Sequence, residues 1–186
     1  MTVHSVAILG LALGAGCGGG GPSITFNGTV QGQSFVPKDA ISAPVATTSR
    51  STVGMVVIAA AGGQCGDLAA NRKPKNLLYM AITLADLDYT TGATAAPTSP
   101  GTYGVSGAFK KADISFTATD GQCTVTQLVY SVDGTVTLTS VSNGAYVGTF
   151  DVHFGNVDHV TGSFSATACS QITPYYIPFT ATWICG

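Results

Sequence analysis

The stretch Gly134–Ala168 reads GTVTLTSVSNGAYVGTFDVHFGNVDHVTGSFSATA, and its pattern decides the fold class. Polar and apolar residues alternate through three runs, which are Gly134–Val141, Tyr146–Phe154 and Val160–Ala168. Alternation with a period of two is typical of strands that bury one face and expose the other. Asn143-Gly144 separates the first two runs and is a strong hairpin signal, because both residues tolerate positive φ. The stretch therefore predicts three strands in an antiparallel meander.

The same alternation assigns each residue of the meander to a face. The predicted buried face is apolar and consists of Val136, Leu138, Tyr146, Phe150, Val152, Phe154, Val160, Phe164 and Ala166. The predicted exposed face is rich in hydroxyl groups and consists of Thr135, Thr137, Thr139, Thr149, Asp151, His153, Thr161, Ser163 and Thr167.

The rest of the chain carries further short strand patterns at a spacing of roughly ten residues, which is typical of sandwiches and barrels. Strands are predicted at Thr52–Ala61, Leu77–Ala85, Thr102–Val105, Ala108–Thr119, Thr124–Val132 and Tyr176–Ile184, and a first hairpin is predicted to pair Ser23–Val30 with Gln33–Pro37. The nearly continuous apolar runs Thr52–Ala61 and Leu77–Ala85 predict central strands that are covered on both sides. Residues 65–72 predict one short helix that ends before Pro74.

We therefore expect an all-β protein of about 9–11 short strands, arranged as an antiparallel β-sandwich, with a closed β-barrel as the alternative. Composition agrees with this class, since Thr, Val, Tyr and Phe favour strands and the chain contains no Glu.

Charge argues against a nucleic-acid partner. Charged residues make up 9% of the chain and the net charge is −2. The densest basic group is Arg72-Lys73-Pro74-Lys75, which is too small to create the positive field that nucleic acids need.

The N-terminal residues predict an export signal. The apolar run Val6–Leu13 is shorter than the ~20 residues of a spanning helix but fits the core of a signal peptide. The small residues Gly14-Ala15-Gly16 then precede Cys17, and here the chain resembles the bacterial lipoprotein family, in which this cysteine receives the lipid.

That resemblance implies a signal peptide at residues 1–16, a lipidated Cys17 with a Gly-rich tether at residues 17–22, and a single all-β domain at residues 23–186. It also implies a lipid anchor in the outer membrane of the cell envelope. The alternative is an ordinary secretory signal that releases a soluble periplasmic or secreted protein.

The C-terminal half also resembles a group of uncharacterised bacterial envelope lipoproteins that end in a similar meander. The shared motifs are GTVTLTSV, GTFDVHFG and VTGSFSATAC. This resemblance implies fold and location, and it implies no activity.

The remaining cysteines, Cys65, Cys123, Cys169 and Cys185, form an even set. In an oxidising compartment such a set predicts two disulfides, and four cysteines allow three pairings. The sequence does not choose among them. We favour Cys65–Cys169 with Cys123–Cys185, because the C-terminal strand needs fastening. The spacing lacks the close pairs of a zinc site, so we expect no metal.

Two groups of side chains could carry chemistry. Asp151 and His153 lie two residues apart on one strand face, near Asp158 and His159, where they would suit a metal or a base with its orienting group. The alternative is an ordinary polar face and turn. Asp86 and Asp88 form the other close acidic pair, as glycosidases or calcium sites require, and the alternative is a solvated strand end.

Two further groups could bind sugars. The threonine array that includes Thr135, Thr137 and Thr139 presents hydroxyls that suit sugars or ordered water. Tyr175 and Tyr176, flanked by prolines, could form a stacking platform, whereas Trp183 fits the core better.

These observations favour a non-enzymatic, lipid-anchored envelope protein that acts as a binding or structural β module, with no catalytic residues and no cofactor. Its expected partners are the membrane, through the lipid, and a glycan or another envelope protein. The first alternative is a carbohydrate-binding domain, and the second is a hydrolase built around Asp151 and His153.

Overall fold

The computed structural model describes residues 23–48, 50–172 and 184–186, and within these ranges the chain forms thirteen strands and one α-helix. The elements are β1 (Thr25–Gly28), β2 (Asp39–Thr48), β3 (Ser51–Ala59), α1 (Gln64–Ala69), β4 (Arg72–Lys73), β5 (Leu78–Leu87), β6 (Thr94–Ala95), β7 (Gly101–Gly104), β8 (Lys110–Thr119), β9 (Val125–Tyr130), β10 (Asp133–Ser142), β11 (Ala145–Phe154), β12 (Asp158–Ala168) and β13 (Ile184–Cys185). The all-β prediction is confirmed, and the short predicted helix corresponds to α1.

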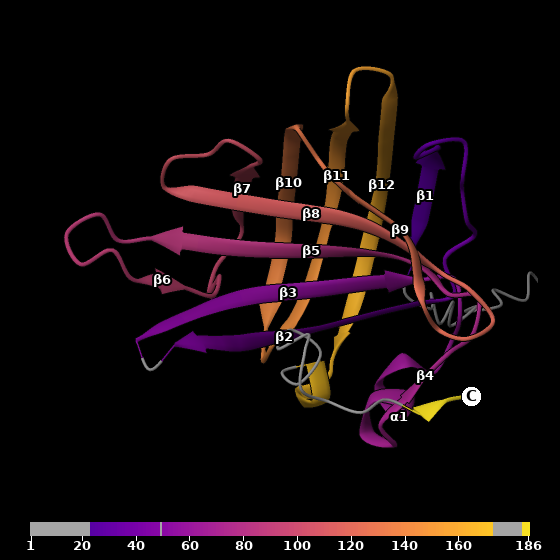
Figure 1. Cartoon of the computed structure of the whole chain (residues 1–186). Helices are drawn as coiled ribbons and strands as arrows, with labels where there is room; N and C mark the ends of the chain where they lie inside the picture. Colours follow the sequence, from indigo (N-terminus) through magenta and orange to yellow (C-terminus); the bar gives the residue numbers. More distant parts are fainter. Residues whose placement is uncertain (1–22, 49, 173–183) are drawn as a thin grey trace, which may run out of the picture.

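Eight of these strands close into a barrel in the order β5-β3-β2-β12-β11-β10-β7-β8, with β8 pairing back to β5. In Figure 1 the strands β3, β5 and β8 pass in front of β10, β11 and β12 and run across them. The two layers of the expected sandwich are therefore present, but they join at both sides, which gives the alternative that we named, the closed barrel. Closure gives each of the eight barrel strands a partner on both sides, whereas β1, β6 and β9 each pair on one side only.

The layers join through two short parallel ladders, where a wholly antiparallel arrangement was expected. Ile41 and Ser42 of β2 pair with the end of β12, and Gly104 of β7 pairs with Lys111 of β8. Ser42 is fully buried at the first joint, where its hydroxyl donates to the carbonyl of Gly144 at 2.8 Å. The joint therefore keeps its polar groups hydrogen bonded, as buried polar groups require.

The barrel interior is filled by side chains, as in other small barrels. Every residue of the predicted buried face of the meander is buried, so that prediction is confirmed. Large and small residues face each other across β11 and β12, since Phe150 pairs with Gly162 and Phe164 pairs with Gly148. Each phenylalanine ring lies against the glycine opposite it.

Strand β1 does not form the predicted first hairpin, which was wrong in its pairing. Val30 and Gln33 make a single bridge, while β1 pairs with β12 instead. Phe26 explains the choice, because its ring packs 4.4 Å from that of Phe35 and 6.3 Å from that of Phe150, measured between ring centroids. Burial of this aromatic group at the end of the barrel draws β1 to the outer strand of the meander.

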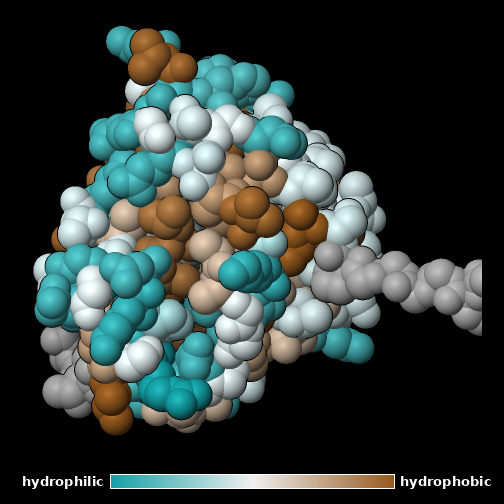
Figure 2. All heavy atoms as spheres, turned by 90° about the vertical axis from the view of Figure 1, so that its right-hand side faces the viewer, coloured by the Kyte–Doolittle hydropathy of each residue, from teal (hydrophilic) through white to brown (hydrophobic). Residues whose placement is uncertain are grey.

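β1 and β9 lie on the right-hand side of Figure 1. The view from that side shows apolar side chains gathered in the centre of the face and polar ones around them (Figure 2). Ile24, Phe26 and Val129 are partly exposed and pack against the core. The interior cluster therefore approaches the surface at this end of the barrel.

Strand β2 was not predicted, because Ala, Ser and Pro44 are poor strand formers. Burial overrides this local preference. Ala40 packs into the barrel, whereas Ile41 and Val45 join a second apolar cluster outside it. That second cluster also contains Met55 of β3, so β3 is covered on both sides as predicted.

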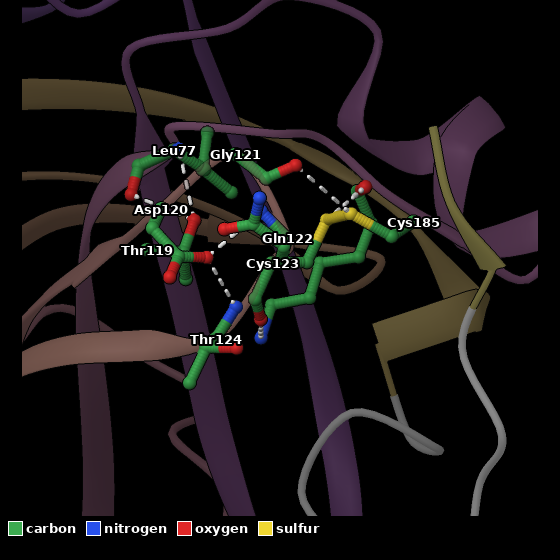
Figure 3. Close-up of a disulfide and its surroundings, with 9 residues drawn as sticks. Leu77, Thr119, Asp120, Gly121, Gln122, Cys123, Thr124 and Cys185 are labelled. Carbon is green, nitrogen blue, oxygen red and sulfur yellow. Dashed lines mark hydrogen bonds between the residues drawn. A yellow bond between two sulfur atoms is a disulfide. The ribbon is translucent and has the colours of Figure 1, made fainter.

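Two disulfides join distant parts of the chain, and the favoured pairing is confirmed. Cys65 of α1 bonds Cys169 just after β12, and Cys123 in the turn between β8 and β9 bonds Cys185 of β13. The turn itself is held by Asp120, whose carboxylate accepts the backbone N–H groups of Gln122 and Thr124 at 2.9 Å (Figure 3). Such an Asx-type turn fixes the direction in which Cys123 faces Cys185.

The contact between Phe150 and Gly162 can be tested by substitution. A Cβ atom at position 162 would overlap the carbonyl oxygen of Thr25 and the Phe150 ring. We expect Gly162→Ala to lower the free energy of unfolding by about 1–3 kcal/mol, measured by urea denaturation, because overpacking forces neighbouring atoms apart. Gly66→Ala is the control, since a Cβ there meets no atom within 4 Å. Equal stability of both variants would contradict this account of the register.

Candidate functional site

Cross-strand register aligns hydroxyl side chains in a row across five strands on the outside of the barrel. The row runs through Thr102, Thr137, Thr149, Ser163 and Thr25, each directly opposite the next. These residues come from β7, β10, β11, β12 and β1 in that order. We call this set the hydroxyl row.

The two ends of the hydroxyl row are hydrogen bonded internally. The hydroxyl oxygens of Thr102 and Thr137 lie 3.1 Å apart, and those of Thr25 and Ser163 lie 3.0 Å apart. Thr149, in the middle, is exposed, and its hydroxyl has no hydrogen-bond partner among the described residues. The row therefore has fixed ends and an open centre.

A second row lies two residues further along the strands, on the same face. It runs through Thr135, Asp151, Thr161 and Asn27, again in direct register. The two rows border a hollow of about 420 Å³, which we call the trough. Its lining consists of Thr25, Asn27, Thr135, Thr137, Thr149, Phe150, Asp151, Thr161, Gly162 and Ser163.

A histidine pair stands beside the trough. The rings of His153 and His159 stack with their centroids 4.4 Å apart, and His159 Nε2 lies 2.7 Å from a carboxylate oxygen of Asp151. Asp151 therefore meets the histidine of the neighbouring strand, and not His153 as the sequence suggested. The side chains of His159 and Asp151 are 50% and 64% exposed, so solvent weakens their attraction.

Other candidates from the sequence are separated from this site. Thr139 lies at the register shift between Leu138 and Ser140 and does not line the trough, and its hydroxyl donates to the carbonyl of Val147. Asp158 accepts the backbone N–H of Gln31. Cys17, Tyr175, Tyr176 and Trp183 lie outside the described residues.

The acidic pair Asp86 and Asp88 does not form a shared site. Asp86 makes an ion pair with Lys110 at 2.7 Å, while Asp88 accepts hydrogen bonds from Thr90 and Thr91 in the turn that follows β5. In the described part of the chain, no group of three or more His, Cys, Asp or Glu residues is arranged to hold a metal ion. Each carboxylate at this strand end therefore binds its own neighbours, and the two do not form a common site.

Sequence reasoning missed two kinds of residue. Thr25 and Asn27 join the trough only because β1 pairs with β12, and the polar residues on either side of Phe26 were the available signal.

Tyr89 and Phe109 form an exposed edge-to-face aromatic pair, with ring centroids 4.8 Å apart, on loops beyond β5 and before β8. This is the kind of platform that the sequence placed at Tyr175 and Tyr176.

No protein-family model matches the chain, and no curated protein or solved structure matches it either. No helix in the described ranges is both long enough and apolar enough to cross a membrane. The two disulfides indicate an oxidising compartment outside the cytoplasm.

Three tyrosines that are wholly or partly buried have shifted pKa values. Burial raises the pKa values of Tyr79, Tyr103 and Tyr146. The hydrogen bond to Asp86 raises the pKa of Lys110, whose ammonium group also lies 3.3 Å from the Tyr103 hydroxyl. All four groups keep their protons to a higher pH when the chain is folded.

This protonation pattern predicts a loss of stability at alkaline pH. A raised folded-state pKa contributes stability below the unfolded value and loses it above, so the decline begins near the ordinary tyrosine pKa of 10.0. Burial lowers the pKa of Lys73, and this shift makes the stability rise with pH. It opposes the effect of the four groups whose pKa values are raised. We expect the urea midpoint to fall as the pH rises above 10.0, and to fall less steeply in Tyr103→Phe. Equal slopes for the two proteins would exclude Tyr103 as a source.

Proposed function

We propose that this chain is an exported, non-enzymatic binding module of the bacterial cell envelope, held to the membrane by a lipid on Cys17, and that the trough binds a glycan. The observation that carries this proposal is the hollow of about 420 Å³ lined by hydroxyl, amide and carboxylate groups. The barrel interior is filled by the apolar side chains of the described core, so we place the ligand on the outer face.

The chemistry of the lining suits sugar hydroxyls. Thr and Ser hydroxyls both donate and accept, the Asn27 amide does the same, and the carboxyl oxygens of Asp151 accept from sugar O–H groups. Ordered water is the other ligand that a threonine array suits. The hollow and its carboxylate favour a shaped polyhydroxylated ligand over a flat layer of water.

Binding without hydrolysis fits the histidine geometry better than catalysis does. An activated nucleophile needs a base within hydrogen-bond reach. Among the described residues, neither His153 nor His159 is hydrogen bonded to a serine or threonine hydroxyl, and His159 bonds Asp151 in an exposed position. A hydrolase built on Asp151 and His153 therefore has less support than a binding site.

Export and anchoring rest on the leader and on the disulfides. Both disulfides need an oxidising compartment, and the apolar run Val6–Leu13 supplies the export signal. Gly18–Gly21 would act as a flexible tether between the lipid and the β domain. Stable attachment needs more than one acyl chain, as the lipoprotein resemblance implies.

Glycan binding is tested on the oxidised protein with a glycan array, followed by calorimetry on the strongest neutral ligand. Thr149→Val keeps the shape of the side chain and removes the open hydroxyl, so we expect about 3- to 10-fold weaker binding. Thr139→Val is the matched control on the same face outside the trough, and we expect no change. An array without signals, or equal losses in both variants, would remove the trough as a glycan site.

Anchoring is tested by mass spectrometry of protein extracted from membranes. We expect the native protein to lack residues 1–16 and to carry acyl chains on Cys17, and we expect Cys17→Ala to leave the membrane fraction. Gly20→Ala, in the same tether, should remain attached. A Cys17→Ala protein that stays membrane-bound, with no mass change beyond the substitution, would rule out the lipid anchor.

A further inference from the structure

We infer that the trough takes an extended, uncharged glycan chain of several sugar rings, laid across the strands along the hydroxyl row. This inference rests on the proposed function and names the ligand class of the same site. It also adds Thr102, on β7, as a subsite beyond the lining of the trough.

The length of the hydroxyl row favours a chain over a single sugar. Neighbouring strands lie about 4.8 Å apart, so the four steps from Thr102 to Thr25 cover roughly 19 Å along the sheet. One sugar ring reaches hydroxyls on adjacent strands only. A chain of linked rings can meet one hydroxyl after another at each strand.

The hydrogen bonding of the row suits this mode of binding. The hydrogen bonds Thr102–Thr137 and Thr25–Ser163 hold the hydroxyls at both ends in place. Binding a ligand there therefore costs less side-chain entropy. Thr149, at the centre, offers a hydroxyl that no described residue occupies. The row is therefore ordered at its ends and available in its middle.

Charge selects against acidic glycans. Asp151, whose carboxylate lies 2.7 Å from His159 Nε2, is the one acidic residue that lines the trough, and no Lys or Arg is among the described residues of its lining. Asp133, in the next register step, lies opposite His153 and adds a second carboxylate on the same side. A carboxylate on a sugar would be repelled, whereas a neutral hydroxyl donates to Asp151.

The test measures affinity against chain length. Calorimetry with neutral cello-, malto- and chito-oligosaccharides, from single sugars to hexamers, is carried out at pH 8, above the ordinary histidine range. We expect affinity to rise at least about tenfold from dimer to hexamer in the bound series and then to level off. Oligogalacturonides of equal length serve as the acidic probe and should bind at least about tenfold more weakly, a difference that Asp151→Asn should reduce.

Substitutions along the row locate the chain. Thr149→Val should weaken every length, whereas Thr102→Val and Thr25→Val should weaken only the longer oligomers. Thr25→Ser retains a hydroxyl and separates its loss from any disturbance of β1, and Thr139→Val should change nothing.

The outcomes separate this inference from the proposed function. Binding that does not depend on chain length, or equal binding of the acidic series, would overturn the extended neutral ligand and leave the glycan site intact. Failure of every oligosaccharide to bind, together with a glycan array without signals, would remove the trough as a glycan site and this inference with it.

Discussion

The complementary sizes of the side chains that face each other across β11 and β12 fix the register on which the outer surface depends. Phe150 lies opposite Gly162, Phe164 opposite Gly148, and Tyr146 opposite Ala166. A slip by one residue would turn the apolar face outward, and a slip by two would set large rings against each other. Because the inner pairs hold this register, the hydroxyls on the outer face line up in rows.

The same packing at the end of the barrel completes the candidate site. Phe26 joins the aromatic group around Phe35 and Phe150, and this packing brings β1 alongside β12. Thr25 and Asn27, its two neighbours, then point to the opposite face and extend both rows by one strand. Core packing and the binding surface are thus two sides of the same strand.

The proposed role agrees with the small number of charged residues. Hydroxyl groups occupy much of the outer face of the meander, and among the described residues the trough contains one acidic side chain, Asp151. The proposed glycan ligand suits such a surface, because hydroxyl groups both donate and accept hydrogen bonds. One disulfide joins α1 to the segment after β12, and the other joins the turn before β9 to β13 near the C-terminus.

The sequence by itself determined the three-stranded meander, its inner and outer faces and the polar character of Thr135, Thr137 and Asp151 on the outer face, because a period of two is a local property of the chain. Tertiary structure decided what depends on distant contacts. Burial made β2 a strand despite Pro44, and short parallel ladders closed the two layers into a barrel. The same holds for the candidate site. The alternation predicts which residues of β10, β11 and β12 lie on its face, whereas the pairing of β1 and β7 depends on packing between distant parts of the chain.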